Sequence, residues 1–436
     1  MNDAVRDSMD LERLRAEVKT TWDKLPPDEQ AALDAKMRAA HVNFLAAQTA
    51  APPRRELVAL HNVLHDNLVA PGPSAPAVAA AAVVWPVDPD GQVKDPLLDY
   101  SAADPRWARC FVAWYNTGPT PAFTVGKAIQ IADTAKIWIL GDWGGANPPA
   151  NSIGTAVKAE AAKSDNYVVH LGDVYYAGTN QSILTYPYEA SNLVNVWPGA
   201  PGRSFTLDSN HEMYAHAEGY VRTALPAQAF QAQGGNCFAL YNNAFRIVGL
   251  DTAYYAPDQS FYGFMQGTLG PSGPGTQMQF LQNQIGALQA GQTLILLTHH
   301  NGLNFDGSVP KPSDDAYQLW QEVTQLMQQI PAGAGKNVWW YWGHQHAGIV
   351  YPQQAVAGTG ITISPRCCGH SCIPWGISSV LTQAKQAGKV TWFENKVLGP
   401  QSNYFVANGY ASLALTGTKL GESFWNQQGA VSWSSP

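Results

Sequence analysis

Five polar clusters, each at the end of a short apolar run, constrain the fold of this chain more than any other feature of its sequence. Segments with helical patterning lie between the runs, at Ser152–Lys163, Thr276–Leu288 and Tyr317–Gln329. Short strands that alternate with helices predict an α/β fold, in which functional side chains collect at the carboxyl ends of the strands. The predicted strands are Lys136–Leu140, Tyr167–Leu171, Ser204–Leu207, Phe245–Leu250, Thr293–Leu297 and Val338–Trp342.

The clusters supply a mixed set of oxygen and nitrogen ligands, comprising two carboxylates, a phenol, a carboxamide and several imidazoles. Such a set suits borderline divalent and trivalent metal ions and needs no thiolate. One Asp after a strand is typical of a turn or a helix cap, so the prediction depends on the order of all five clusters. They are Gly141-Asp142-Trp143-Gly144, Gly172-Asp173-Val174-Tyr175-Tyr176, Ser209-Asn210-His211-Glu212, Thr298-His299-His300 and Gly343-His344-Gln345-His346.

This order resembles the calcineurin-like metallophosphoesterase superfamily, and within it the purple acid phosphatase pattern. Two features separate that branch from its relatives. Asp142 lies in Gly-Asp-x-Gly, where most of the superfamily has Asp-x-His, and Tyr176 stands three residues after Asp173. The resemblance covers roughly residues 130–350. It implies a four-layer αββα metallophosphoesterase sandwich that carries a binuclear metal site, here preceded by an α-helical N-terminal extension.

Carried over to this sequence, the resemblance implies two metal ions that share the carboxylate of Asp173. The first ion is held by Asp142, Asp173, Tyr176 and His346, and the second by Asp173, Asn210, His299 and His344. A free Tyr has a pKa near 10, so a phenolate ligand favours a strongly acidic ion such as Fe(III). The neutral carboxamide of Asn210 suits a divalent ion such as Zn, Fe(II) or Mn.

Two adjacent imidazoles compete for one of these ligand positions. His299 directly follows the apolar strand and its Thr, which is the ligand position in the family. We therefore assign the metal to His299 and expect His300 to face the substrate or to pack behind the ligands. The sequence departs from the family pattern at two positions that affect the shape of the pocket. Ser209 replaces the usual Gly before Asn-His, and Asn301 replaces a common Pro.

The implied activity is hydrolysis of phosphomonoesters by attack of a metal-bound hydroxide, which makes the chain an acid phosphatase-like phosphoric ester hydrolase. His211 would contact the phosphate or protonate the leaving alkoxide, with Glu212 orienting it; the alternative is a structural His that supports Asn210. A phosphodiesterase acting on cyclic nucleotides, nucleotides or phospholipid head groups is the second candidate. A non-catalytic binding protein on the same fold is the third.

Three segments with Pro breaks between them predict helices at the front of the chain. Their spacing indicates a small bundle or packed extension, through which the chain could form oligomers or cover the active site. His61 and His65 stand four residues apart, but no HExxH pattern accompanies them, so an interface or surface role is favoured over a metal. The predicted organisation is an extension at 1–72, a linker and lead-in segment at 73–129 and the catalytic domain at 130–436.

Charge and hydropathy restrict the partners. The chain has 26 basic and 33 acidic residues, a net charge of −7, which argues against a nucleic-acid or anionic-membrane binder. The expected partner is instead a small phosphate ester. The first residues are charged and lack an apolar core, so no signal peptide is visible. The stretch Ala75–Trp85 is too short to span a bilayer. We therefore expect a cytoplasmic protein without a transmembrane segment.

Several further features leave their alternatives open. The odd count of five cysteines argues against a disulfide framework. The dense group Cys367, Cys368, His370 and Cys372 would hold an extra metal, form a disulfide or belong to a loop at the rim of the site. Arg366 would meet a phosphate or lie on the surface, with the surface favoured. Asp251 is expected to shape a turn, Trp339, Trp340 and Trp342 to build core and pocket wall, and Tyr404–Trp433 to be β structure.

Overall fold

The computed structural model describes residues 3–46, 54–65, 88–93, 99–180, 187–261, 263–397 and 405–435. The chain divides into two compact units. Unit 1 comprises Met1–Gly118, Pro374–Val380 and Asn395–Val406, and unit 2 comprises Pro119–Ile373, Leu381–Glu394 and Ala407–Pro436. All five polar clusters lie in unit 2. The predicted linker at Pro71–Pro76 and the apolar stretch Ala75–Trp85 lie outside the described residues.

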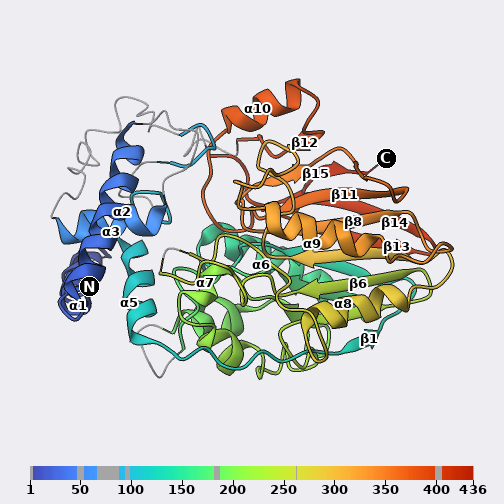
Figure 1. Cartoon of the computed structure of the whole chain (residues 1–436), viewed down its shortest axis with the longest axis horizontal. Helices are drawn as coiled ribbons and strands as arrows, with labels where there is room; N and C mark the ends of the chain where they lie inside the picture. Colours follow the sequence, from blue (N-terminus) through green and yellow to red (C-terminus); the bar gives the residue numbers. More distant parts are fainter. Residues whose placement is uncertain are drawn as a thin grey trace. The chain divides into compact units, whose positions relative to one another are not determined.

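Unit 2 contains two β-sheets (Figure 1). In the larger sheet, β6, β7, β8 and β11 run parallel to one another. Its strand order is β1 (Ala128–Gln130), β5 (Phe238–Tyr241), β6 (Phe245–Leu250), β7 (Thr293–Thr298), β8 (Asn337–Trp342), β11 (Ile361–Cys368), β9 (Gly348–Val350) and β12 (Trp392–Phe393), with β10 (Gln354–Val356) paired to β11. Parallel strands of this kind are buried on both faces, which explains why β6, β7 and β8 are continuous apolar runs in the sequence; β11 was not predicted.

The smaller sheet joins the front of unit 2 to the end of the chain. Its order is β15 (Val431–Ser434), β14 (Lys419–Asn426), β13 (Gly409–Thr416), β2 (Lys136–Leu140), β3 (Asn166–His170) and β4 (Ser204–Thr206). The strands β2, β3 and β4 are parallel, so their carboxyl ends lie at one edge. The tail adds an antiparallel hairpin to β2, as the predicted β structure of that segment required.

Helices cover the outer faces of the two sheets, and the four layers predicted from the sequence are confirmed (Figure 1). One apolar cluster fills the space between the sheets and includes Ile137, Val169 and Ile295. A second cluster joins the other face of the larger sheet to α8 and α9, where Trp320 stacks on Trp340 at 6.2 Å between ring centroids. The helices are α6 (Pro148–Ala161), α8 (Gln277–Gly286), α9 (Tyr317–Met327) and α10 (Ser379–Gln386), with short helical turns at α7 (Asn210–Met213), η2 (Glu189–Leu193), η3 (Val194–Val196) and η4 (Tyr220–Ala224).

A buried ion pair links the two sheets. The Nε and Nη2 atoms of Arg366 on β11 donate to the carboxylate of Glu422 on β14 at 2.9 and 3.0 Å. The hydroxyl of Tyr341 contacts the same carboxylate. The surface role favoured for Arg366 is therefore wrong, and so is the phosphate contact, because its guanidinium is buried against a carboxylate between the sheets. Trp340 and Trp342 are buried in the core, as predicted.

Unit 1 contains the predicted N-terminal helices. They are α1 (Asp3–Trp22), α2 (Pro27–Ala46) and α3 (Arg55–Leu64), followed by η1 (Pro105–Ala108) and α5 (Arg109–Asn116). His61 of α3 stacks on His41 of α2, with 4.1 Å between ring centroids. His65 pairs through Nε2 with Asp34 Oδ1 at 3.0 Å. Among the described residues, these histidines form no group close enough to share a metal ion.

Candidate metal centre

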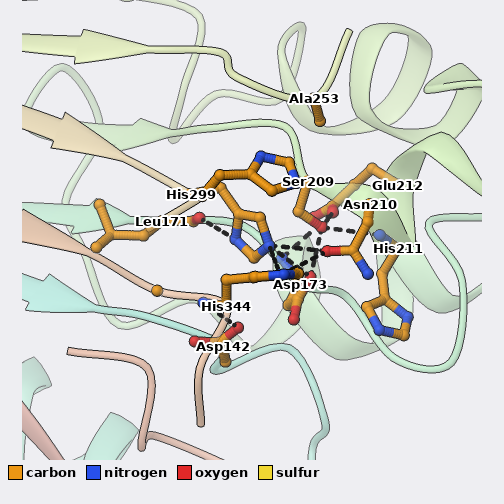
Figure 2. Close-up of polar contacts among 12 residues, drawn as sticks. Asp142, Leu171, Asp173, Ser209, Asn210, His211, Glu212, Ala253, His299 and His344 are labelled. Carbon is orange, nitrogen blue, oxygen red and sulfur yellow. Dashed lines mark hydrogen bonds and ion pairs between the residues drawn. The ribbon is translucent and has the colours of Figure 1, made fainter. Parts of the chain in front are cut away.

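The candidate ligands meet where the carboxyl ends of strands from both sheets come together. Asp142 and Asp173 follow β2 and β3 in the smaller sheet, and Asn210 follows β4. His299 directly follows β7 in the larger sheet, and His344 and His346 follow β8. Figure 2 shows side chains from these five strands converging on one buried point. The sheet edges therefore bring together residues that are up to about 200 positions apart in the sequence.

One half of the centre consists of four ligand atoms packed around a common point. His299 Nε2 lies 2.9 Å from Asn210 Oδ1, 3.1 Å from His344 Nδ1 and 3.3 Å from Asp173 Oδ1. Asn210 Oδ1 lies 3.2 Å from His344 Nδ1. Ligand atoms that each bind one ion at about 2.1 Å are separated by roughly 3.0–3.4 Å. The spacing therefore fits a single metal ion.

The protonation of His299 supports this interpretation. Its Nδ1 lies 2.9 Å from the carbonyl oxygen of Leu171, to which it donates. Burial lowers the pKa of His299 to about 3, so the ring is neutral and Nε2 carries a lone pair. That lone pair faces the oxygen atoms of Asn210 and Asp173, which are also electron-rich. A cation at their centre converts this repulsion into coordination.

The second half of the centre gathers around the other oxygen of Asp173. Asp173 Oδ2 lies 3.6 Å from His346 Nε2, and His346 Nε2 lies 3.8 Å from Asp142 Oδ1. Burial and the charge of Asp173 raise the pKa of the Asp142 carboxyl well above its usual range. Asp142 Oδ2 is buried and has no hydrogen-bond partner among the described residues. Two carboxylates placed so close together favour a second cation.

The two adjacent tyrosines lie differently. The hydroxyl of Tyr175 donates to Asp173 Oδ2 at 2.9 Å and lies 2.9 Å from His346 Nε2. The ring of Tyr176 packs edge-on against Tyr188, with 5.9 Å between centroids. The resemblance assigned the phenolate ligand to Tyr176, whereas the phenol in contact with these two ligands is that of Tyr175. Sequence reasoning did not single out Tyr175, although it lies in the same cluster.

Four of the candidate ligands have a left-handed backbone. The φ angles are 56° at Asp142, 76° at Asp173, 66° at His344 and 46° at His346. Residues with a Cβ rarely adopt this region, and such strain concentrates at functional sites where the surrounding structure enforces it. Gly172, with a φ of 95°, precedes Asp173 and allows the tight turn. The turns after the strands therefore aim these side chains at the centre.

Ser209 and Glu212 are two buried residues outside the candidate ligand set that contact Asp173. The Ser209 hydroxyl lies 2.6 Å from Asp173 Oδ1 and is also in contact with Glu212 Oε2. The backbone N–H of Asp173 donates to the same Glu212 oxygen at 3.2 Å. Burial and then the charge of Asp173 raise the pKa of Glu212 to about 8. Glu212 therefore contacts Asp173, a role that sequence reasoning did not foresee.

Two further imidazoles lie beside the ligands. His211 Nδ1 lies 2.6 Å from the carbonyl oxygen of Tyr176, to which it donates. His300 is buried, with Nδ1 at 2.9 Å from the Thr252 hydroxyl and Nε2 at 2.7 Å from the carbonyl oxygen of Phe264. Both ring nitrogens of His300 thus have protein partners, and contact with a substrate through either nitrogen requires exchange of one of these bonds.

The remaining candidate features are structural. All five cysteines are buried and none is in a disulfide in the described part of the chain, and Cys367 and Cys368 lie in β11 rather than in a loop. Among the described residues, Cys367, Cys368 and Cys372 join no group close enough to share a metal ion. The disulfide and metal alternatives for this group are therefore not realised in the structure. Asp251 accepts from the backbone N–H groups of Ala253 and Tyr254, so the predicted turn is confirmed.

Comparison with known proteins gives a likeness in fold only. No family model and no curated protein matches the sequence. One similar solved structure is GAP50, the anchor in the inner membrane complex of Plasmodium, with 13% identity over 69% of this chain and 88% of that chain and a TM-score of 0.42. A predicted phosphoesterase from Streptococcus pneumoniae has 10% identity, with 69% of this chain and 96% of that chain covered and a TM-score of 0.27. Vps29 of Chaetomium thermophilum has 10% identity, with 70% of this chain and 95% of that chain covered and a TM-score of 0.28.

Identities and TM-scores this low transfer no activity to this chain. Among the residues that the structure describes, no helix combines the length and the apolar character needed to cross a bilayer.

Proposed function

We propose that this chain is a phosphoric ester hydrolase with a binuclear metal centre, related to the calcineurin-like metallophosphoesterases and acting on phosphomonoesters. The observation that carries the proposal is the arrangement of Asp173. Its Oδ1 lies 3.3 Å from His299 Nε2, which also contacts Asn210 and His344, and its Oδ2 contacts His346 and the Tyr175 hydroxyl. A carboxylate with one oxygen toward each of two ligand groups is the arrangement that a bridged pair of ions requires.

The ions, when bound, clamp a phosphate and lower the pKa of water at the centre. The residues of the chain orient that centre. Leu171 fixes the tautomer of His299 through its carbonyl oxygen, and the backbone N–H of His344 donates to Asp142 Oδ1 at 3.0 Å. These contacts hold the ligand atoms in place before any ion or substrate binds, which lowers the cost of assembling the site.

His211 is proposed as the residue that handles a proton at the leaving group. Its bond to the Tyr176 carbonyl assigns the proton of the neutral ring to Nδ1. Nε2 is then the atom that takes up a proton when the ring becomes charged and gives it to a leaving alkoxide. Imidazole side chains commonly serve as the proton donor to a leaving group in enzymes.

The choice of metals follows from the ligand types. Asn210, His299, His344 and one carboxylate oxygen provide a set with low negative charge, which suits Zn, Fe(II) or Mn. The other half, with Asp142, Asp173, His346 and a nearby phenol, is more negative and suits Fe. Neither half of the centre uses a thiolate.

The ligand role of Asp173 is tested by Asp173→Asn, with Asp165→Asn as the matched control. Asp165 is exposed at the start of β3, so the same chemical change there leaves the centre untouched. We expect Asp173→Asn to lose metal and to lower kcat at least 100-fold, since a bridging ligand serves both ions. Elemental analysis and hydrolysis of p-nitrophenyl phosphate provide the two measurements. An active Asp173→Asn protein that retains two ions per chain would refute the assignment.

The preference for monoesters is tested by comparing p-nitrophenyl phosphate with bis(p-nitrophenyl) phosphate on the same metal-loaded protein. We expect the larger kcat/KM for the monoester. A larger value for the diester would move the proposal to a phosphodiesterase, and hydrolysis of neither by a protein with two ions would favour a binding protein.

A further inference from the structure

We infer that Ser209 is a positioning residue that orients the bridging carboxylate and thereby sets the affinity for one of the two ions, the one held by Asn210, His299 and His344. The inference rests on the proposed binuclear function and deepens it.

The hydroxyl of Ser209 is engaged on three sides. It accepts from the backbone N–H of His211 at 3.0 Å, which caps the start of α7. It lies 2.6 Å from Asp173 Oδ1, a short distance typical of a hydroxyl that donates to a carboxylate. Its third contact is Glu212 Oε2. Ser209 is fully buried, so water does not compete for these bonds.

The Ser209 hydroxyl has one proton to donate, and we assign that proton to its bond with Asp173 Oδ1. Asp173 Oδ1 also lies 3.3 Å from His299 Nε2, but His299 carries its proton on Nδ1, so the Ser209 hydroxyl donates to Oδ1 where His299 does not. A hydrogen bond from Ser209 fixes the rotation of the carboxylate about its last bond. Oδ1 is thereby directed toward Asn210, His299 and His344.

The other oxygen of the same carboxylate has its own hydroxyl. Tyr175 donates to Asp173 Oδ2 at 2.9 Å, on the side of His346. The carboxylate is therefore held by one hydroxyl on each oxygen. Removing Ser209 releases only Oδ1, which predicts an unequal effect on the two ions rather than a general loss of the centre.

Ser209→Gly isolates this role from helix capping. Gly is a nearly equivalent N-cap residue, and the substitution adds no atoms to this buried position. The variant therefore removes the hydroxyl while the start of α7 is kept. Ser209→Thr restores a hydroxyl and is the conservative rescue, and thermal unfolding of the metal-free proteins shows whether either variant is folded.

The experiment is a titration of metal-free full-length protein with Zn²⁺ alone, followed calorimetrically, with stoichiometry checked by elemental analysis. We expect wild type to bind two ions, and Ser209→Gly to bind one ion normally and the other about 10–100-fold more weakly, the usual effect of removing a hydrogen-bond partner of a ligand. Ser209→Thr should recover most of that affinity.

Equal affinities for both ions in wild type and Ser209→Gly would overturn the role of Ser209 while the proposed hydrolase activity, measured separately, would stand. Equal weakening of both ions would also overturn it, because the effect would then be general. Failure of wild type to bind any Zn²⁺ would overturn both proposals at once.

Discussion

At the scale of single residues, the choice between two neighbouring tyrosines defines the more negative half of the centre. Tyr175 and Tyr176 differ by one position, and only the fold decides which phenol turns inward. The Tyr175 hydroxyl lies 2.9 Å from both Asp173 Oδ2 and His346 Nε2, while the Tyr176 ring packs on Tyr188. The two residues therefore provide a matched pair of variants.

If a phenolate binds Fe(III) in this centre, the iron-loaded protein has a visible charge-transfer band. We expect Tyr175→Phe to abolish the band and Tyr176→Phe to retain it, because the Phe substitution removes only the hydroxyl. Absorption spectra of the two iron-loaded variants at equal iron content provide the measurement. Loss of the band in Tyr176→Phe alone would return the ligand role to the residue that the family pattern assigns.

Sequence reasoning identified most of the residues that meet at the centre, because ligand types at strand ends form a recognisable order. It did not identify Tyr175, since side-chain direction in an irregular turn has no periodicity from which it can be read. It also assigned Arg366 to the surface, because the partner Glu422 lies 56 residues away on a different sheet.

At the scale of elements, the turn after β3 is as important as the strand for placing Asp173 beside the other candidate ligands. Gly172 has a φ of 95°, and a Cβ there would lie 2.7 Å from Ser209 Cβ and 3.1 Å from His299 Nδ1. Gly202 provides a matched control, since its φ is 74° and a Cβ there meets nothing within 4 Å. Both positions strain an Ala backbone, but only one lies against ligands.

We therefore expect Gly172→Ala to destabilise the protein by about 1–3 kcal/mol more than Gly202→Ala, the usual cost of overpacking. Gly172→Ala should also weaken Zn²⁺ binding, whereas Gly202→Ala should not. Denaturant unfolding of the metal-free variants and Zn²⁺ titration test the two parts. Identical unfolding and binding for both variants would show that the turn tolerates a side chain.

The histidines of α2 and α3 make unit 1 sensitive to acid. Burial lowers the pKa of His41 and of His61, and for His61 the nearby His41 and His65 lower it further. Arg38 and His65 are the basic groups around Asp34, and His65 pairs with that carboxylate. Because the folded pKa values lie below the unfolded value of 6.5, this stability is present above pH 6.5 and is lost as the pH falls below it.

Hydrogen exchange of the peptides of α2 and α3 in the full chain, corrected for intrinsic rates, should accordingly show weaker protection at pH 5.5 than at pH 7.5. His61→Phe keeps an aromatic ring on His41 and removes one titrating group, so its protection should depend less on pH. A pH dependence unchanged from wild type in that variant would contradict the account.

The parallel strands β6, β7 and β8 were predictable because burial on both faces makes them uninterrupted apolar runs, whereas β11 (Ile361–Cys368) was not predicted. The short strands β1, β9, β10 and β12 have only two or three residues each, and β5 has four. Pairing with neighbouring strands, rather than composition, creates such short strands. The contribution of 374–380 and 395–406 to unit 1 likewise depends on contacts between distant segments.

At the scale of the whole molecule, the net charge of −7 is compatible with binding of an anion. In the proposed centre, two ions at a buried point would supply the local positive charge that no excess of Lys or Arg provides. The buried carboxyls of Asp142 and Asp173 are unfavourable without those ions, so metal binding and stability are coupled. Metal ions that bind only the folded state should raise the unfolding temperature in proportion to the logarithm of their concentration.

The central claim is that two metal ions, shared through Asp173, are required for turnover. It is tested most directly by measuring metal content and hydrolysis of p-nitrophenyl phosphate on one sample before chelation, after chelation and after metal is restored. The account predicts two ions per chain, no turnover in the chelated protein and recovery as the second ion binds. Full turnover by a protein with no metal, or with one ion per chain, would contradict it.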